Sequence, residues 1–240
     1  NKMMNGLMGD LGVYLDNAPA EMDAESTAYR PEKSWNFEAG GHFDKWIGSG
    51  HLSGSASAFY ILCRDQQITI FPPGMSTGRM MANVGRSRSI GAEATLSYGY
   101  KGLSVSAAYG YTDARFTSYD DGNNDYSGNR IPYSPEHTMN FRVGYLFPLL
   151  NNSIVRNISV NADCSGIGRI WWDEANQFVE PFVAQVGADI SVAFNWFDLR
   201  FRMDNILNED YNVFYFKSVG NHFFQRGKPL RWNIGINISL

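Results

Sequence analysis

Residues 229–240 alternate strictly between apolar and polar side chains, which is the period of a β-strand and not of an α-helix. One face of this stretch is wholly apolar and carries Leu230, Trp232, Ile234, Ile236, Ile238 and Leu240. A strand of this length, once tilted, spans a hydrocarbon layer of about 25 Å, whereas strands of soluble sandwiches are usually about five or six residues long. The stretch therefore predicts a strand that presents one face to lipid, provided that the rest of the chain repeats the pattern.

The same alternation recurs from Lys33 onwards, and no stretch has the helical period. It predicts roughly nine strands, at residues 33–46, 52–70, 90–100, 103–111, 139–147, 158–164, 182–194, 197–203 and 230–240. Residues 1–32, with their glycines, prolines and acidic side chains, predict an irregular outer-loop segment. We expect an all-β fold, an antiparallel up-and-down transmembrane β-barrel whose C-terminal part is residues 33–240.

The connections between these strands alternate in length. The joins at residues 48–50, 100–102, 148–156 and 195–196 are short, and those at 71–82, 117–136, 171–180 and 206–228 are long. Outer-membrane barrels have short turns in the periplasm and long loops outside the cell. Counting back from Leu240 at the periplasmic end places every short join on the periplasmic side, which favours a membrane barrel over a soluble sandwich.

Composition and charge exclude a nucleic-acid partner, and the cysteine positions argue against a disulfide. The net charge of −4 and the pI near 5.6 supply no basic surface for nucleic acid. A mean hydropathy of −0.30 is typical of a soluble protein, but in a membrane barrel only every second residue faces lipid. Cys63 and Cys164 lie in different strands at opposite parities, so we expect no disulfide between them.

Four stretches of the chain resemble the C-terminal part of a TonB-dependent outer-membrane receptor. They are residues 29–40 (from Tyr29 to Gly40), 83–93 with Gly91-Ala92-Glu93, 128–137 with Gly-Asn-Arg-Ile-Pro-Tyr-Ser-Pro-Glu-His, and 204–211 followed by 227–231. The resemblance covers almost all of residues 29–240. It departs from the family at Leu240, where Phe is common, which weakens the likeness to the C-terminal signal read by the barrel-assembly machinery.

The resemblance implies about nine C-terminal strands of a 22-stranded barrel in the bacterial outer membrane, with a plug domain that this chain lacks. It implies uptake of a scarce extracellular ligand, such as an iron chelate, a cobalamin-like molecule or a glycan. Energy would come from a TonB-type energising protein that engages the missing N-terminal part. It implies no catalysis and no cofactor. A small self-closing barrel, acting as a porin or hydrolase, and a soluble all-β binding module remain alternatives.

One set of residues is a candidate for ligand binding, and a second set is expected to line the lumen. Trp171, Trp172, Phe223 and Phe224 lie in predicted outer loops, where their rings either stack on a ligand or anchor the barrel at the lipid headgroups. Charged residues at the parity opposite the apolar faces are expected to line the lumen, because on the lipid face each would cost several kcal/mol. They include Glu93, Arg142, Asp189, Arg200, Arg202 and Arg231, and Glu38, Asp163, Asp198 and Asp204 share their parity.

Arg86 and Arg88 are exceptions, since by parity with Ile90 they face outwards near the outer rim. Phosphates of the outer leaflet, solvent, or a bulge that turns them inwards are the alternatives for their surroundings. The acidic run at residues 120–125 does not have the spacing of a calcium loop, which favours a solvated loop. His42, His51, His137 and His222 are scattered, so no metal site is expected.

Overall fold

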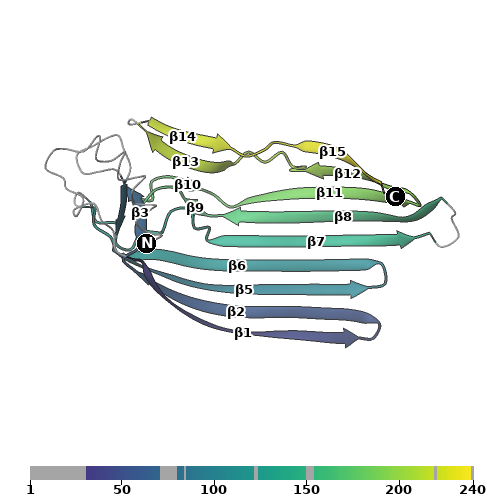
Figure 1. Ribbon diagram of the computed structural model, residues 1–240, viewed down its shortest axis with the longest axis horizontal. Helices are drawn as coiled ribbons and strands as arrows, with labels where there is room; N and C mark the ends of the chain where they lie inside the picture. The colour runs from purple at the N-terminus through teal and green to yellow at the C-terminus, as the bar shows by residue number, and fades with distance from the viewer. Residues whose placement is uncertain are drawn as a thin grey trace.

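The computed structural model describes residues 31–70, 80–83, 85–121, 124–149, 154–218 and 221–238. In these ranges nine strands form one antiparallel sheet in which spatial neighbours follow each other in chain order (Figure 1). The strands are β1 (Lys33–Ile47), β2 (Gly50–Arg64), β5 (Arg86–Tyr100), β6 (Leu103–Ser118), β7 (His137–Pro148), β8 (Val155–Gly168), β11 (Val183–Phe194), β12 (Phe197–Asp204) and β15 (Arg231–Ile238). The expected all-β, up-and-down architecture is confirmed. The sheet is open, with β1 and β15 at its edges.

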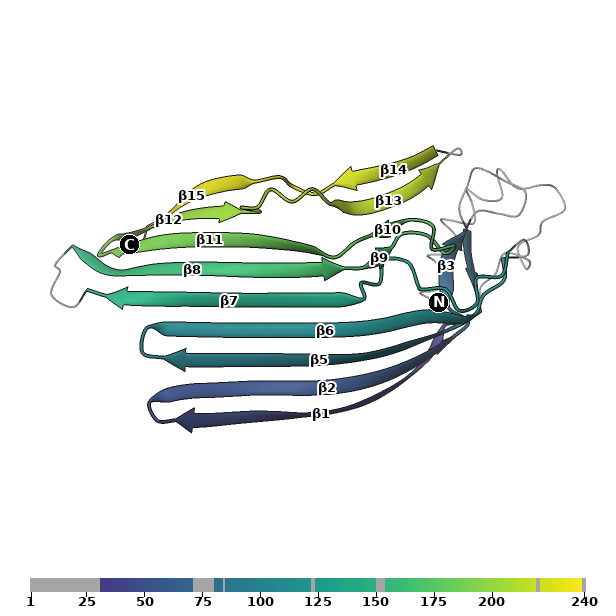
Figure 2. The same ribbon diagram turned by 180° about the vertical axis from the view of Figure 1, so that it is seen from behind.

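The turns and loops are sorted to opposite ends of the sheet, as the join lengths predict. Tight connections at Gly48–Ser49, Lys101–Gly102 and Asn195–Trp196 lie at one end, which is on the right in Figure 1. Gly48 and Lys101 have positive φ values of 61° and 50°, which the tight reversals require. The described residues of the long connections lie at the other end, which is on the right in Figure 2.

Three short hairpins occupy the loop end: β3 (Gln67–Ile70) with β4 (Met80–Asn83), β9 (Ile170–Trp171) with β10 (Val179–Glu180), and β13 (Asn212–Ser218) with β14 (Asn221–Arg226). The predicted single strand at residues 52–70 is therefore divided. Asp65 adopts a left-handed conformation (φ 54°), which ends β2, and its carbonyl accepts a hydrogen bond from Asn83 Nδ2 at 2.6 Å. The irregular segment expected at residues 1–32 falls almost entirely outside the described residues.

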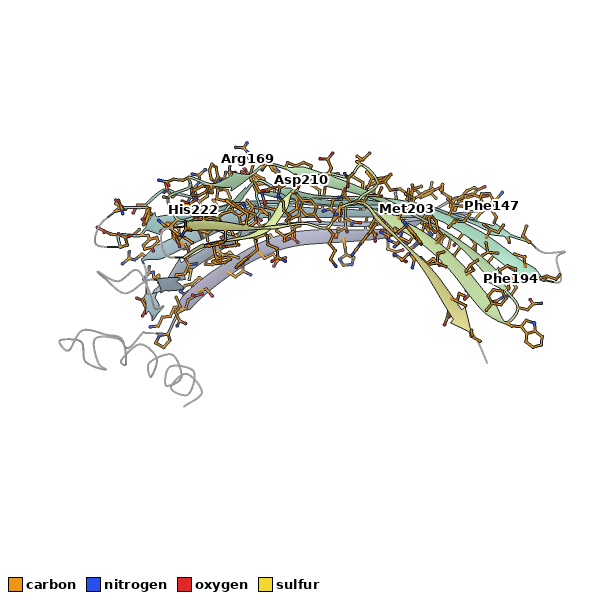
Figure 3. The ribbon with its side chains drawn as sticks, turned by 90° about the horizontal axis from the view of Figure 1, so that it is seen from above. Phe147, Arg169, Phe194, Met203, Asp210 and His222 are labelled. Carbon is orange, nitrogen blue, oxygen red and sulfur yellow. The ribbon has the colours of Figure 1, made fainter. Side chains whose placement is uncertain are left out.

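The strand register separates an apolar face from a polar face. Apolar residues stand opposite one another across strands, as Ala188 does with Ala162 and Met203, while the next pair along β11 joins Asp189 with Arg202. The sheet bends into an arc with Phe147 and Arg169 on its convex side (Figure 3). Phe147 belongs to the apolar set of β7, so the convex face is the apolar one.

The apolar face is left open to its surroundings. On β15, Trp232, Ile234, Ile236 and Ile238 keep 60–67% of their surface exposed. An exposed apolar face of this extent marks a surface that meets lipid or another protein. The buried apolar clusters of the described residues lie instead at the loop end, around Phe116 and around Trp172. Among the described residues no helix is long and apolar enough to cross a membrane, a finding that concerns helices alone.

Candidate functional site

A network of ion pairs runs along the polar face across five neighbouring strands, β7, β8, β11, β12 and β15. We call it the charged wall. Its members are Arg142, Asp163, Asp189, Arg200, Arg202, Asp204 and Arg231. The strand period places all seven on one face, and the antiparallel register brings them into adjacent rows.

Asp189 is the centre of the charged wall, and only 1% of its side chain is exposed. Its Oδ1 accepts hydrogen bonds from Arg200 at 2.7 Å and from Arg202 at 3.2 Å, and its Oδ2 accepts one from Asn161 at 2.9 Å. Arg142 lies 4.0 Å away. A buried carboxylate is tolerated only when it is paired and hydrogen-bonded, and Asp189 meets both conditions.

Arg202 connects Asp189 to the rest of the charged wall. It donates two hydrogen bonds to Asp163, at 2.8 and 3.2 Å, and a third to Asp204 at 2.7 Å. Asp204 in turn accepts a hydrogen bond from Arg231 on β15 at 3.1 Å. Paired bonds between a guanidinium and a carboxylate fix geometry as well as charge, so these strands are held in register by side chains as well as by backbone.

The charged wall presents its positive groups to the surroundings and encloses its negative groups. The three carboxylates are 1–22% exposed, whereas the side chains of Arg142, Arg200 and Arg231 are 48–52% exposed. Its net charge is +1, from four arginines and three aspartates. The face therefore offers guanidinium donors to an anionic group. Glu93 lies on the same face, on β5, opposite Gly110.

Aromatic side chains form a second cluster at the loop end, which we call the loop cluster. Ile170, Trp172 and Tyr215 are its buried core, and Phe178 packs against them. The Phe178 ring stacks on Tyr215 with 5.2 Å between centroids and approaches His222 at 4.7 Å. The cluster therefore joins the β9–β10 hairpin to the β13–β14 hairpin.

The four predicted aromatic candidates have different surroundings. Trp172 is enclosed, with 4% exposed, and its ring meets Tyr133 at 5.3 Å. Trp171 is half-buried. Phe223 and Phe224 are 44% and 43% exposed and, as neighbours in one strand, face opposite sides of their hairpin. Phe224 packs on Tyr215 at 5.0 Å, and Phe223 stacks on Phe216 at 4.9 Å.

Burial alters the ionisation of side chains in this loop region. Burial raises the pKa of Tyr215, whose hydroxyl lies 2.7 Å from His222 Nδ1. Burial likewise raises the pKa of Glu174, with a further contribution from the charge of Asp173. The Nε1 atom of Trp172 is buried and has no hydrogen-bond partner among the described residues.

Polar residues that the sequence pattern does not single out hold the loops in place. Asn176 accepts a hydrogen bond from the Arg130 amide at 2.7 Å and donates one to the Arg130 carbonyl at 3.0 Å. Glu180 is buried and accepts two hydrogen bonds from Asn212, at 3.0 and 2.8 Å. Asn205, also buried, donates to the carbonyls of residues 209 and 228. The only signal for them in the sequence is an asparagine or a glutamate beside a turn.

The remaining candidate ligand groups are engaged locally. Asp121 accepts hydrogen bonds from the Asn124 amide at 2.7 Å and from Tyr126, and Asp125 accepts one from the Ser127 amide at 2.9 Å. Within the described ranges no three His, Cys, Asp or Glu residues come together in a way that could hold a metal ion. The thiols of Cys63 and Cys164 are both free, in agreement with their opposite parities.

Comparison with known proteins identifies the fold. A family model described as TonB dependent receptor-like, beta-barrel matches residues 7–206. The ferric yersiniabactin uptake receptor FyuA from Yersinia pestis is similar over 86% of this chain and 30% of its own length, at 19% identity and a TM-score of 0.70.

Two other solved structures give the same result. The siderophore receptor PiuA from Acinetobacter baumannii matches over 90% of this chain and 30% of its own, at 21% identity and a TM-score of 0.68. The ferric-catecholate import receptor Fiu from E. coli K12 matches over 92% of this chain and 30% of its own, at 18% identity and a TM-score of 0.66. The chain thus spans about three tenths of the receptors that it matches. It belongs to the TonB-dependent receptor-like β-barrel family, whose members are receptors and transporters of the outer membrane.

Proposed function

We propose that this chain forms one wall of an outer-membrane receptor that takes up an anionic metal chelate, with ferric chelates preferred to cobalamin-like molecules and glycans. The observation that carries the proposal is the charge distribution of the charged wall. Its carboxylates are enclosed and three of its arginines are half-exposed, so the polar face offers cationic donors over a scaffold that neutralises most of its own charge.

The charged wall can meet an imported ligand only where the polar face is the lumen. Charges on a lipid-facing strand surface cost about 2–4 kcal/mol each near the midplane, whereas charges that line a water-filled interior carry no such cost. Fixed positive groups in a narrow interior raise the local concentration of anions and speed their capture. Ferric complexes of carboxylate and catecholate chelators generally carry negative charge, so Arg142, Arg200 and Arg231 suit them better than they suit a neutral glycan.

The names of the similar structures support the same class of cargo. Those three receptors are described as taking up ferric yersiniabactin, a siderophore and a ferric catecholate. In the proposal, the extracellular ligand first meets the exposed rings of Phe223 and Phe224 and the half-buried ring of Trp171, while Trp172 supports the loop cluster from within. A plug domain would face the charged wall, and a TonB-type protein would supply energy through that plug.

Uptake of radioactive iron tests the proposal. A strain that lacks the complete receptor is complemented with the wild-type gene or with Arg142→Gln/Arg231→Gln, and uptake of ⁵⁵Fe is measured for a panel of anionic ferric chelates under iron limitation. We expect one chelate to depend on the receptor and on a TonB-type protein. Its apparent affinity should fall about tenfold in the variant, the loss expected when charge-assisted hydrogen bonds are removed.

A matched control removes the same charge elsewhere. Lys45→Gln/Lys101→Gln deletes two cations at the turn end and should leave uptake unchanged. Receptor-dependent uptake of cyanocobalamin or maltodextrin, with no ferric chelate transported, would contradict the proposed cargo. Uptake of a ferric chelate that is unaffected by the arginine variant would contradict the role of the charged wall.

A further inference from the structure

Four arginines gather on the convex face where the strands approach the long loops. They are Arg64 on β2, Arg86 and Arg88 on β5, and Arg115 on β6, and we call them the outer arginine block. All four share the parity of the apolar face. Ile90, on the same face, is only two residues from Arg88, which is roughly 7 Å along the strand. The block therefore borders the apolar surface directly at its loop end.

The register sets like charges directly against one another. Arg64 is the cross-strand partner of Arg86, and Arg88 is the partner of Arg115. Opposed side chains in an antiparallel sheet have Cβ atoms about 5 Å apart, and like charges in that position are destabilising. An anion placed between or above the guanidinium groups would therefore stabilise each pair.

The chain supplies such an anion to one pair. Asp113 lies 2.9 Å from Arg115, 3.8 Å from Arg88 and 3.0 Å from Arg130. Its side chain is 18% exposed, so it sits among the guanidinium groups rather than in open solvent.

A second carboxylate supports this arrangement from the loops. Arg130 donates a hydrogen bond to the buried Glu136 at 2.8 Å, and Arg169 lies 3.7 Å from the same carboxylate. Figure 3 shows Arg169 on the convex side of the sheet, on which the outer arginine block also lies. The loop residues thus hold Arg130 and Asp113 in place and leave Arg88 and Arg115 each 36% exposed.

The described part of the chain supplies no anion to the other pair. Within the described ranges no carboxylate lies within ion-pair distance of Arg64 or Arg86, and both side chains are exposed. Two opposed guanidinium groups, at the border of an apolar surface and beside a partly neutralised pair, are left with unused donors.

We propose that the outer arginine block binds the phosphate groups of an outer-leaflet saccharolipid of the lipid A type, whose acyl chains lie along the apolar convex face. Guanidinium groups form paired hydrogen bonds with phosphate, and the location at the rim is the level of the lipid headgroups. The apolar residues next to the block suit acyl chains. A free phosphate or an acidic protein would make no use of this apolar surface. Lipid binding is independent of the cargo proposed above.

Native mass spectrometry of the complete receptor in detergent tests this site. The receptor is stripped of lipid and titrated with diphosphorylated lipid A, with the same lipid after enzymatic removal of both phosphates, and with inorganic pyrophosphate. We expect the phosphorylated lipid to bind at least about fivefold more tightly than the dephosphorylated one, and we expect binding to weaken as salt rises. Equal binding of the two lipids would overturn the proposal, and this comparison needs no variant. Tight binding of pyrophosphate that displaces the lipid completely would also overturn it, because the site would then be a phosphate site and not a lipid site.

Variants locate the site on the chain. Arg64→Gln/Arg86→Gln leaves the Asp113 network intact and should lower affinity for the phosphorylated lipid about fivefold or more, to the level of the dephosphorylated lipid. Lys45→Gln/Lys101→Gln removes the same charge from the turn end and should bind as wild type does. The assignment would be refuted if the arginine variant bound the phosphorylated lipid as tightly as the wild type does. It would also be refuted if the lysine variant lost as much affinity as the arginine variant.

Discussion

Asp189 shows how a single buried carboxylate organises the polar face. It is almost fully enclosed on a strand whose alternate residues are apolar, yet three polar groups satisfy its oxygens. Removal of one partner from a buried ion pair is costly because the other charge is left unpaired, whereas exposed pairs contribute little.

Asp189→Asn should therefore destabilise the barrel by about 2–3 kcal/mol, less than for a fully buried pair because Arg200 remains half in solvent. Urea unfolding of the complete receptor, followed by tryptophan fluorescence, measures the change. The control is Asp198→Asn, which removes an exposed partner of Arg156 and should cost no more than about 1 kcal/mol. Equal losses in the two variants would show that Asp189 is not the centre of the network.

At the scale of single residues, the sequence predicts on which face of the sheet a charged side chain lies but not which residue it pairs with. Strand parity places Arg142, Asp189 and Arg202 on one face, because successive side chains of a strand alternate. It does not say that Arg202 bonds to both Asp163 and Asp204, since that depends on the register between strands that are distant in sequence. The same reason explains why the opposition of Arg64 and Arg86 becomes evident only in the structure.

Among the structural elements, the hairpins at the loop end differ most from expectation. The nine long strands could be predicted because apolar and polar residues alternate along them. β13 and β14 could not, because Phe214-Tyr215-Phe216 and Phe223-Phe224 place aromatic rings on both faces and remove the alternation. One of those faces packs into the loop cluster through Tyr215 and Phe224, and the other holds the stacked pair of Phe216 and Phe223.

Phe178→Ala should loosen the β13–β14 hairpin, because its ring contacts Tyr215, His222 and Phe224 together. Truncating a packed Phe typically costs about 3–5 kcal/mol, and the partial exposure of Phe178 sets the expected loss near the lower end. Limited proteolysis of the complete receptor should then cut within residues 212–226 at least tenfold faster. Phe216→Ala, on the other face of the hairpin, should have a much smaller effect. If protease cleaved the Phe216→Ala variant as fast as the Phe178→Ala variant, the loop cluster would not be what holds the hairpin.

At the scale of the whole molecule, the sheet has two chemically different faces, with tight turns at one end and loops at the other. The apolar convex face, the charged wall and the grouping of the described loop residues at one end are what a segment of an outer-membrane barrel requires. Edge strands β1 and β15 present unpaired backbone, which is costly in lipid, so in the membrane each needs a pairing partner. Length and parity predict this architecture from the sequence, whereas the number of strands that complete the barrel depends on residues outside the sheet.

The alternation of environment along β11 tests the central claim most directly. Single cysteines are placed at Val186, Ala188, Ile190, Gln185 and Ser191 in the complete receptor, with Cys63 and Cys164 replaced by serine, and spin-labelled in lipid bilayers. Collision rates with oxygen, which partitions into lipid, should be high at 186, 188 and 190, and those with a water-soluble nickel chelate should be high at 185 and 191. Access of the nickel chelate to both sets, or the reverse alternation, would contradict the assignment of the convex face to lipid and the charged wall to the lumen.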